Sequence, residues 1–84
     1  MIRSFKDVDT AALFSGGHSR RFQSFERVAI RKLHQLNQTK DLLKELGSIG
    51  DRKDQWSMRI NDQWRLCFAW HEGDAFDVEI VDYH

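Results

Sequence analysis

The chain has 84 residues, of which 40% are hydrophobic and 31% are charged, and its formal net charge at pH 7 is zero. These totals predict one globular domain over residues 1–84 and argue against disorder, repeats and strong non-specific nucleic-acid binding, which needs net positive potential. No apolar run approaches 18 residues and the N-terminus lacks the apolar stretch of a signal peptide, so we expect no membrane association. The single cysteine, Cys67, fits a reducing compartment and favours a cytoplasmic location.

The opening residues predict a short strand and then a helix. MIRSF has the composition of a brief strand, and Ser4 with Asp7 three residues later has the spacing of a helix start capped by Ser4. Gly16 and Gly17 are expected to end this helix, because glycine is favoured just past a helix C-terminus.

A second, longer helix is expected to begin with Ser19 as its cap. Its apolar residues follow 3-4-4-3 spacing, which places them on one face of a helix. They are Phe22, Phe25, Ala29, Leu33 and Leu36. A short third helical turn, KDLLKEL, is expected after Thr39 and before Gly47.

From residue 56 onward the hydrophobic period changes to two, which predicts three half-buried strands over 56–60, 64–71 and 75–81. Three-residue turns at 61–63 and 72–74 would join them. This register brings the apolar side chains to one face, since a slip of one residue would expose a whole set. It pairs Met58 with Leu66, Leu66 with Ile80, Phe68 with Val78 and Trp70 with Phe76. We expect these residues and Trp64 to be buried under the long helix, with Trp56, Trp64 and Trp70 serving in packing.

The opposite face of the sheet then carries two arginines side by side. Arg59 lies directly across from Arg65, and Arg65 lies across from Val81. Like charges placed directly opposite destabilise a strand pair. Two interpretations remain open: Glu79 or Asp77 neutralises the arginines on a solvated face, or the two guanidinium groups hold a phosphate, which their planar geometry suits.

The last strand runs into Asp82, Tyr83 and His84, each of which can accept or donate a proton. By themselves such residues are either a frayed end or a functional site. No metal or other cofactor is expected, because the four histidines show no ligand spacing and there is no HExxH or CxxC motif. Cys67 has no evident neighbouring base, and His34 is interpreted as a surface or interface residue.

The strand segment WSMRINDQWRLCFAW, followed by GDAFDVEIVDYH, resembles the HigB toxins, including the GraT-like branch, of the RelE/ParE superfamily. The opening MIRSF and the RRF at the start of the second helix also fit. The resemblance implies an α+β fold, with N-terminal helices packed on one face of a mostly antiparallel sheet. It also implies the toxin of a type II toxin–antitoxin system, a ribosome-dependent endoribonuclease (an mRNA interferase) that inhibits translation.

The resemblance also assigns catalytic residues by position. Arg65 matches the arginine that contacts the scissile phosphate, and Asp82, Tyr83 and His84 match the terminal acid, phenol and imidazole of the active site. Cleavage without a metal needs a base for the 2′-hydroxyl, a cation for the phosphorane and an acid for the leaving oxygen. Arg65 suits the second role, Asp82 and His84 suit proton transfer, and Tyr83 could stack on a base.

Further residues are expected to bind RNA. Arg59 shares the face of Arg65. The loop LGSIGDRKDQW is shorter than in relatives of this family, and Lys53 or Arg52 could supply its basic group.

The resemblance implies a HigA-like antitoxin with a helix-turn-helix as partner, besides the 70S ribosome and messenger RNA, with operator DNA reached only through the antitoxin. We expect the antitoxin on the basic side of the long helix or, alternatively, at the N-terminal helix. The basic side comprises Arg20, Arg21, Arg27, Arg31 and Lys32. Two other functions remain open: a non-catalytic ParE-like gyrase inhibitor, and a catalytically decayed module that only binds its antitoxin.

Overall fold

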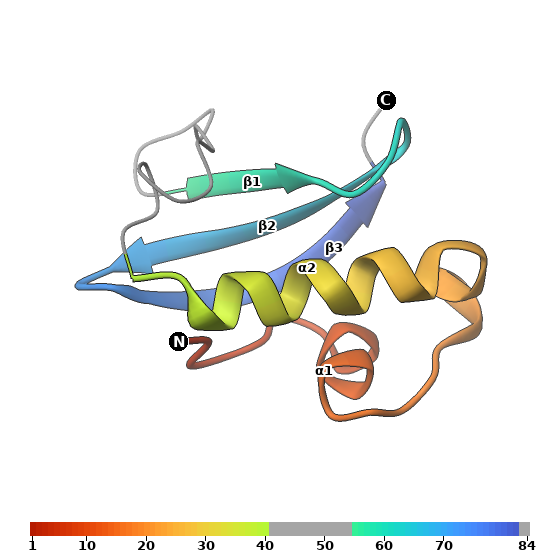
Figure 1. The fold of residues 1–84 in the computed structure, drawn as a ribbon, viewed down its shortest axis with the longest axis horizontal. Coiled ribbons are helices and arrows are strands. Elements are labelled where there is room, and N and C mark those ends of the chain that lie inside the picture. The colour runs from red at the N-terminus through yellow and green to blue at the C-terminus, as the bar shows by residue number, and fades with distance from the viewer. Residues whose placement is uncertain (41–54, 83–84) are drawn as a thin grey trace.

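A computed structural model of the chain describes residues 1–40 and 55–82 (Figure 1). In chain order its elements are α1 (Val8–Phe14), the 3₁₀ helix η1 (Arg20–Phe25), α2 (Glu26–Gln38), β1 (Gln55–Arg59), β2 (Trp64–His71) and β3 (Asp74–Asp82). The third helical turn expected in KDLLKEL lies outside the described residues. Within the described ranges, no helix has the length and apolar character needed to cross a bilayer.

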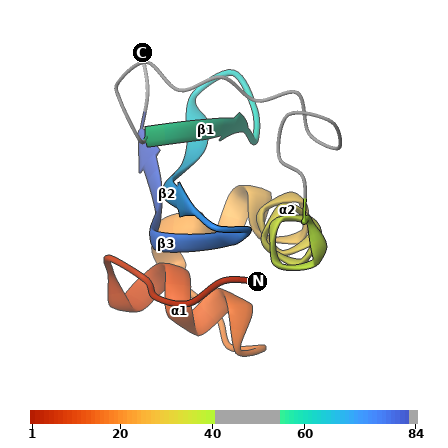
Figure 2. The ribbon, with the colours of Figure 1, turned by 90° about the vertical axis from the view of Figure 1, so that its left-hand side faces the viewer.

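Two α-helices pack against an antiparallel sheet, so the predicted α+β fold is confirmed. Within the described ranges the sheet has three strands in the order β1-β2-β3. The helix α2 contacts β2 and β3, and α1 contacts α2 and β3, an arrangement that Figure 2 shows from the side.

The core lies between the helices and one face of the sheet. All five apolar positions predicted for the long helix are buried, although its first part is the 3₁₀ helix η1 rather than α-helix. The strands contribute residues from the face predicted to be apolar. The buried hydrophobic residues are Leu13, Phe22, Phe25, Ala29, Leu33, Leu36, Met58, Ile60, Leu66, Phe68, Ala75, Val78 and Ile80. Trp56, Trp64 and Trp70 pack against this core as expected, but Trp64 and Trp70 are only partly buried, where the sequence predicted burial.

The turn between β2 and β3 is shorter than predicted. His71 pairs with Asp74, so only Glu72 and Gly73 form the turn, with φ of 49° and 85°. Positive φ at both central residues is typical of a type I′ turn, whose twist matches that of the flanking strands. The predicted pair of Trp70 with Phe76 is therefore wrong, and Trp70 pairs with Ala75 instead.

A β-bulge restores the predicted register farther from the turn. The pairing shifts between Cys67 and Ala69, and Asp77 on β3 has a φ of 53°. The extra residue means that Phe68 does not form its predicted pair with Val78, while Leu66 still pairs with Ile80. Phe76 is consequently only half-buried and lies beside His71, with ring centroids 5.9 Å apart, so its predicted core position is also wrong.

The N-terminal segment covers the outer edge of β3. Ile2 and Phe5 form parallel bridges with Ala75 and Val78, so the expected opening strand is present as two isolated bridges. The Ser4 hydroxyl accepts a hydrogen bond from the Asp77 N–H at 2.9 Å. Ser4 is therefore not the helix cap that the sequence predicted. An unpaired strand edge invites association with other chains, and this segment covers it.

The helix α1 is capped by Asp7, whose carboxylate accepts a hydrogen bond from the Thr10 N–H at 3.0 Å. Thr10 in turn extends the cover of the β3 edge, because its hydroxyl oxygen accepts the Ile80 N–H at 3.2 Å. Ser19 precedes η1 as predicted but forms no capping hydrogen bond through its side chain.

Candidate active-site face of the sheet

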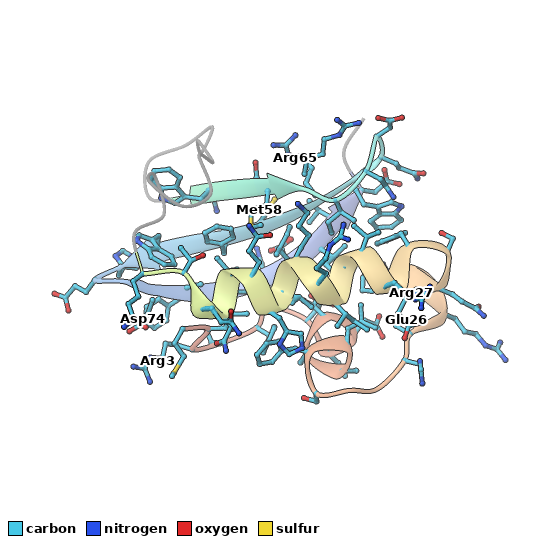
Figure 3. All side chains as sticks on the ribbon, in the orientation of Figure 1. Arg3, Glu26, Arg27, Met58, Arg65 and Asp74 are labelled. Atoms are coloured by element: carbon cyan, nitrogen blue, oxygen red, sulfur yellow. The ribbon has the colours of Figure 1, made fainter. Side chains whose placement is uncertain are left out.

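The face of the sheet opposite the helices carries the predicted arginine pair. Arg59 pairs with Arg65, and Arg65 pairs with Val81, as the sequence predicted. Figure 3 shows Arg65 pointing away from α2, whereas Met58 points toward it. The alternation along β1 and β2 thus separates a helix-covered core from a face that presents cationic side chains.

Arg65 is half-buried and is held by the neighbouring strand. Its Nε donates a hydrogen bond to the Ser57 hydroxyl at 3.1 Å. Ser57 pairs directly with Cys67, so it is a diagonal neighbour of Arg65 on the same face. The guanidinium plane is therefore tied along one edge to β1.

Arg59 is turned into the connection between β1 and β2. Its Nε donates to the Asn61 carbonyl oxygen at 3.3 Å, and a terminal nitrogen pairs with the Asp62 carboxylate. The repulsion expected between the two arginines is thereby reduced, because Asp62 offsets the charge of Arg59. Both members of this ion pair are exposed, so its net contribution to stability is small.

The acidic residues expected to neutralise the arginines have other neighbours. Glu79 forms an ion pair with Lys6, with the Nζ and Oε2 atoms 3.1 Å apart, and Asp77 is exposed at the bulge. This contact places the negative charge of Glu79 next to the N-terminal segment.

Asp82, the last described residue, lies at the end of β3 and is exposed. It pairs with Trp64, and its carboxylate accepts a hydrogen bond from the Gln63 Nε2 at 3.1 Å. Since adjacent residues of a strand point to opposite faces, Asp82 leaves β3 on the side opposite to Val81 and Arg65. The structure thus brings Arg59 and Arg65 together but directs Asp82 to the rim of the sheet.

Four further predicted residues, Arg52, Lys53, Tyr83 and His84, lie outside the described residues. Among the described residues, no group of three or more histidine, cysteine or acidic side chains gathers as metal binding would require. Ser57 and Asp62 were not predicted from the sequence. The spacing of Arg59 and Asp62 could have indicated their ion pair, but the contact of Ser57 requires the strand register and the direction of the Arg65 side chain.

A second candidate surface lies on η1 and the start of α2. A hollow of about 580 Å³ is lined by the apolar side chains of Phe25, Val28 and Ile30 and also by Arg27. Glu26 and His18 also line the hollow, and the His18 ring engages Glu26, with Oε1 and Nδ1 2.6 Å apart. The hollow therefore combines apolar walls with a nearby positive charge.

The basic side of the long helix is only partly available for a partner. Arg20, Arg27 and Arg31 are exposed and form no ion pair with described residues, and Lys32 is half-buried. Arg21 is less available to a partner, because its guanidinium already contacts other side chains of the chain. It lies 5.0 Å from the centre of the Phe22 ring and 4.0 Å from the Asp9 carboxylate.

Comparison with known proteins agrees with the resemblance. No family model matches the chain. Over an alignment of 95 positions that covers the whole of both chains, the chain is 27% identical to Endoribonuclease HigB from Proteus vulgaris.

Proposed function

We propose, from the chain's similarity to Endoribonuclease HigB and its resemblance to the HigB-type toxins of the RelE superfamily, that it is an endoribonuclease and the toxin of a type II toxin–antitoxin system. Its substrate would be messenger RNA on the 70S ribosome, so that cleavage inhibits translation in the cytoplasm. The observation that carries the proposal is the placement of Arg65 on the face opposite the helices, beside Arg59 and near the strand end that bears Asp82.

The chemistry assigned to these residues is transesterification at a phosphodiester. A base removes the proton of the 2′-hydroxyl, the oxygen attacks the phosphorus, and an acid protonates the departing 5′-oxygen. Arg65 stabilises the charge that develops on the phosphorane. His84 and Asp82 are assigned to proton transfer, and Tyr83 to stacking or orientation. Because Asp82 leaves β3 on the face away from Arg65, we place its action at the rim of the sheet.

Arg59, Arg52 and Lys53 are assigned to binding of the RNA backbone, where cationic side chains contribute to affinity without reading sequence. Arg59 suits this role because it is exposed. Its ion pair with Asp62 neutralises part of its charge, so its contact with RNA would be weaker than that of Arg65.

The test is cleavage of a defined message by the purified chain, with and without programmed ribosomes. The proposal predicts cuts only when ribosomes are present, with a 2′,3′-cyclic phosphate on one fragment and a 5′-hydroxyl on the other. A message with a 2′-O-methyl group at the cut site should resist. Cleavage of free RNA would refute the ribosome dependence, and fragments with 5′-phosphates would refute the attack by the 2′-hydroxyl. Absence of any cleavage, with inhibition of gyrase instead, would establish the ParE-like alternative.

The proposed partner is a HigA-like antitoxin with a helix-turn-helix, and we place its contact on η1 and α2. The support is the hollow walled by Phe25, Val28 and Ile30, together with the exposed charges of Arg27 and Arg31. An acidic segment with an apolar side chain at its centre would match both features. Operator DNA would be reached only through the antitoxin.

A further inference from the structure

We propose that Ser57 is the positioning residue for Arg65: its hydroxyl on β1 holds the Nε edge of the guanidinium so that Arg65 keeps one orientation toward the phosphate of the RNA. The inference rests on the proposed function, because it concerns the arginine that the proposed cleavage requires.

The sheet register explains why Ser57 can act on Arg65. Ser57 is not the residue opposite Arg65 but its diagonal neighbour on the adjacent strand. Diagonal neighbours on one face lie about 7–8 Å apart, a separation that a long side chain can span. Arg65 does so with its Nε 3.1 Å from the Ser57 Oγ, and both residues are half-buried.

Arg59, the arginine next to Arg65, makes its own contacts away from the Ser57 hydroxyl. Arg59 lies directly opposite Arg65, but its Nε donates to the Asn61 carbonyl and its terminal nitrogen pairs with Asp62. The charge of Arg59 is thus directed into the turn, and β1 offers Arg65 a neutral hydroxyl oxygen as a contact on this face.

A fixed Arg65 matters because catalysis by charge stabilisation depends on preorganisation. The guanidinium is a planar fork on a long, flexible stem, and its geometry favours a phosphate only when the plane is correctly turned. Anchoring the Nε edge limits rotation of that plane before RNA binds, so less reorientation is needed as charge develops on the phosphorane. Ser57 would then act on the rate of cleavage more than on binding of the ribosome.

The experiment measures kcat and KM for message cleavage on programmed ribosomes with Ser57→Ala, Ser57→Thr and Arg65→Ala. Ser57→Ala should lower kcat about 10- to 100-fold, as small misplacements of catalytic groups do, with little change in KM. Ser57→Thr should restore most of the rate, because threonine retains the hydroxyl and is favoured in strands. In the Arg65→Ala background, Ser57→Ala should have no further effect.

Ser15→Ala is the control for loss of a serine hydroxyl, because Ser15 is exposed at the C-terminal end of α1. Urea melts of each variant show whether the fold is retained. A normal kcat for Ser57→Ala, with Arg65→Ala inactive, would overturn this inference and leave the proposed function intact. Equal loss in Ser57→Thr and Ser57→Ala would overturn it as well. Full activity of Arg65→Ala would overturn the role assigned to Arg65, whereas absence of cleavage by the parent would overturn the proposed function itself.

Discussion

Replacing Thr10 by valine should destabilise the protein although it leaves no cavity. Thr10 is 0% exposed, and its hydroxyl oxygen accepts the N–H of Ile80, which is 1% exposed. Valine has nearly the same shape but no acceptor, so the Ile80 N–H would remain buried without a partner. An unsatisfied buried donor costs about 1–3 kcal/mol. In a domain of this size each kcal/mol corresponds to about 4–8 °C in Tm.

Urea melts and amide hydrogen exchange measure this effect together. The free energy of unfolding should fall by the stated amount, and the Ile80 amide should lose more protection than the other amides of β3. Thr10→Ser is the matched control, because serine retains the acceptor and should keep the Ile80 amide protected even if the lost methyl group costs some stability. A Thr10→Val variant as stable as the parent, with Ile80 equally protected, would refute the role of α1 in covering the β3 edge.

Three further predictions follow from the core, the N-terminal ion pairs and the helix surface. Phe68→Ala should cost roughly 3–5 kcal/mol in a urea melt, because Phe68 is a large, 3% exposed core residue; no loss would disprove the strand register. The hydrogen bond from Arg3 lowers the pKa of Asp74 below 3.8, so its stabilising contribution is present at neutral pH and is lost as pH falls through the lowered pKa. Asp74→Asn should therefore destabilise at pH 7 but not well below the lowered pKa. Charge reversal at Arg27 and Arg31 should weaken antitoxin binding and its salt dependence in a titration, whereas reversal at the exposed Lys40 should not; equal binding would place the interface elsewhere.

The sequence was sufficient for the helix face and for most of the sheet register. Apolar spacing identified the buried side of η1 and α2, and the period-two pattern paired Arg59 with Arg65 and Leu66 with Ile80. The register prediction failed near the turn between β2 and β3. Glu72 adopts a positive φ there, which a glutamate in the sequence does not indicate. The tight turn moved Phe76 off the core face, and the bulge at Asp77 then returned the later residues to the predicted register.

Less of the candidate site could be predicted, because it depends on where long side chains point. The register gave the like-charged pair, but it could not show that Asp62 draws Arg59 into the turn or that Ser57 holds Arg65. Likewise, the position of Asp82 in the sequence suggested a shared site with Arg65, whereas the pleat of β3 directs the two side chains to opposite faces.

The most direct measurement is message cleavage on programmed ribosomes by the parent, Arg65→Ala, and the double variant Arg65→Ala, His84→Gln, each shown to be folded by circular dichroism. Loss of one electrostatic contact to a transition state typically lowers the rate about 10²–10³-fold, so Arg65→Ala should fall by that factor and the double variant further. Arg59→Ala is the control and should weaken binding more than turnover. Full cleavage by the folded double variant would contradict the assignment of this face of the sheet as the active site.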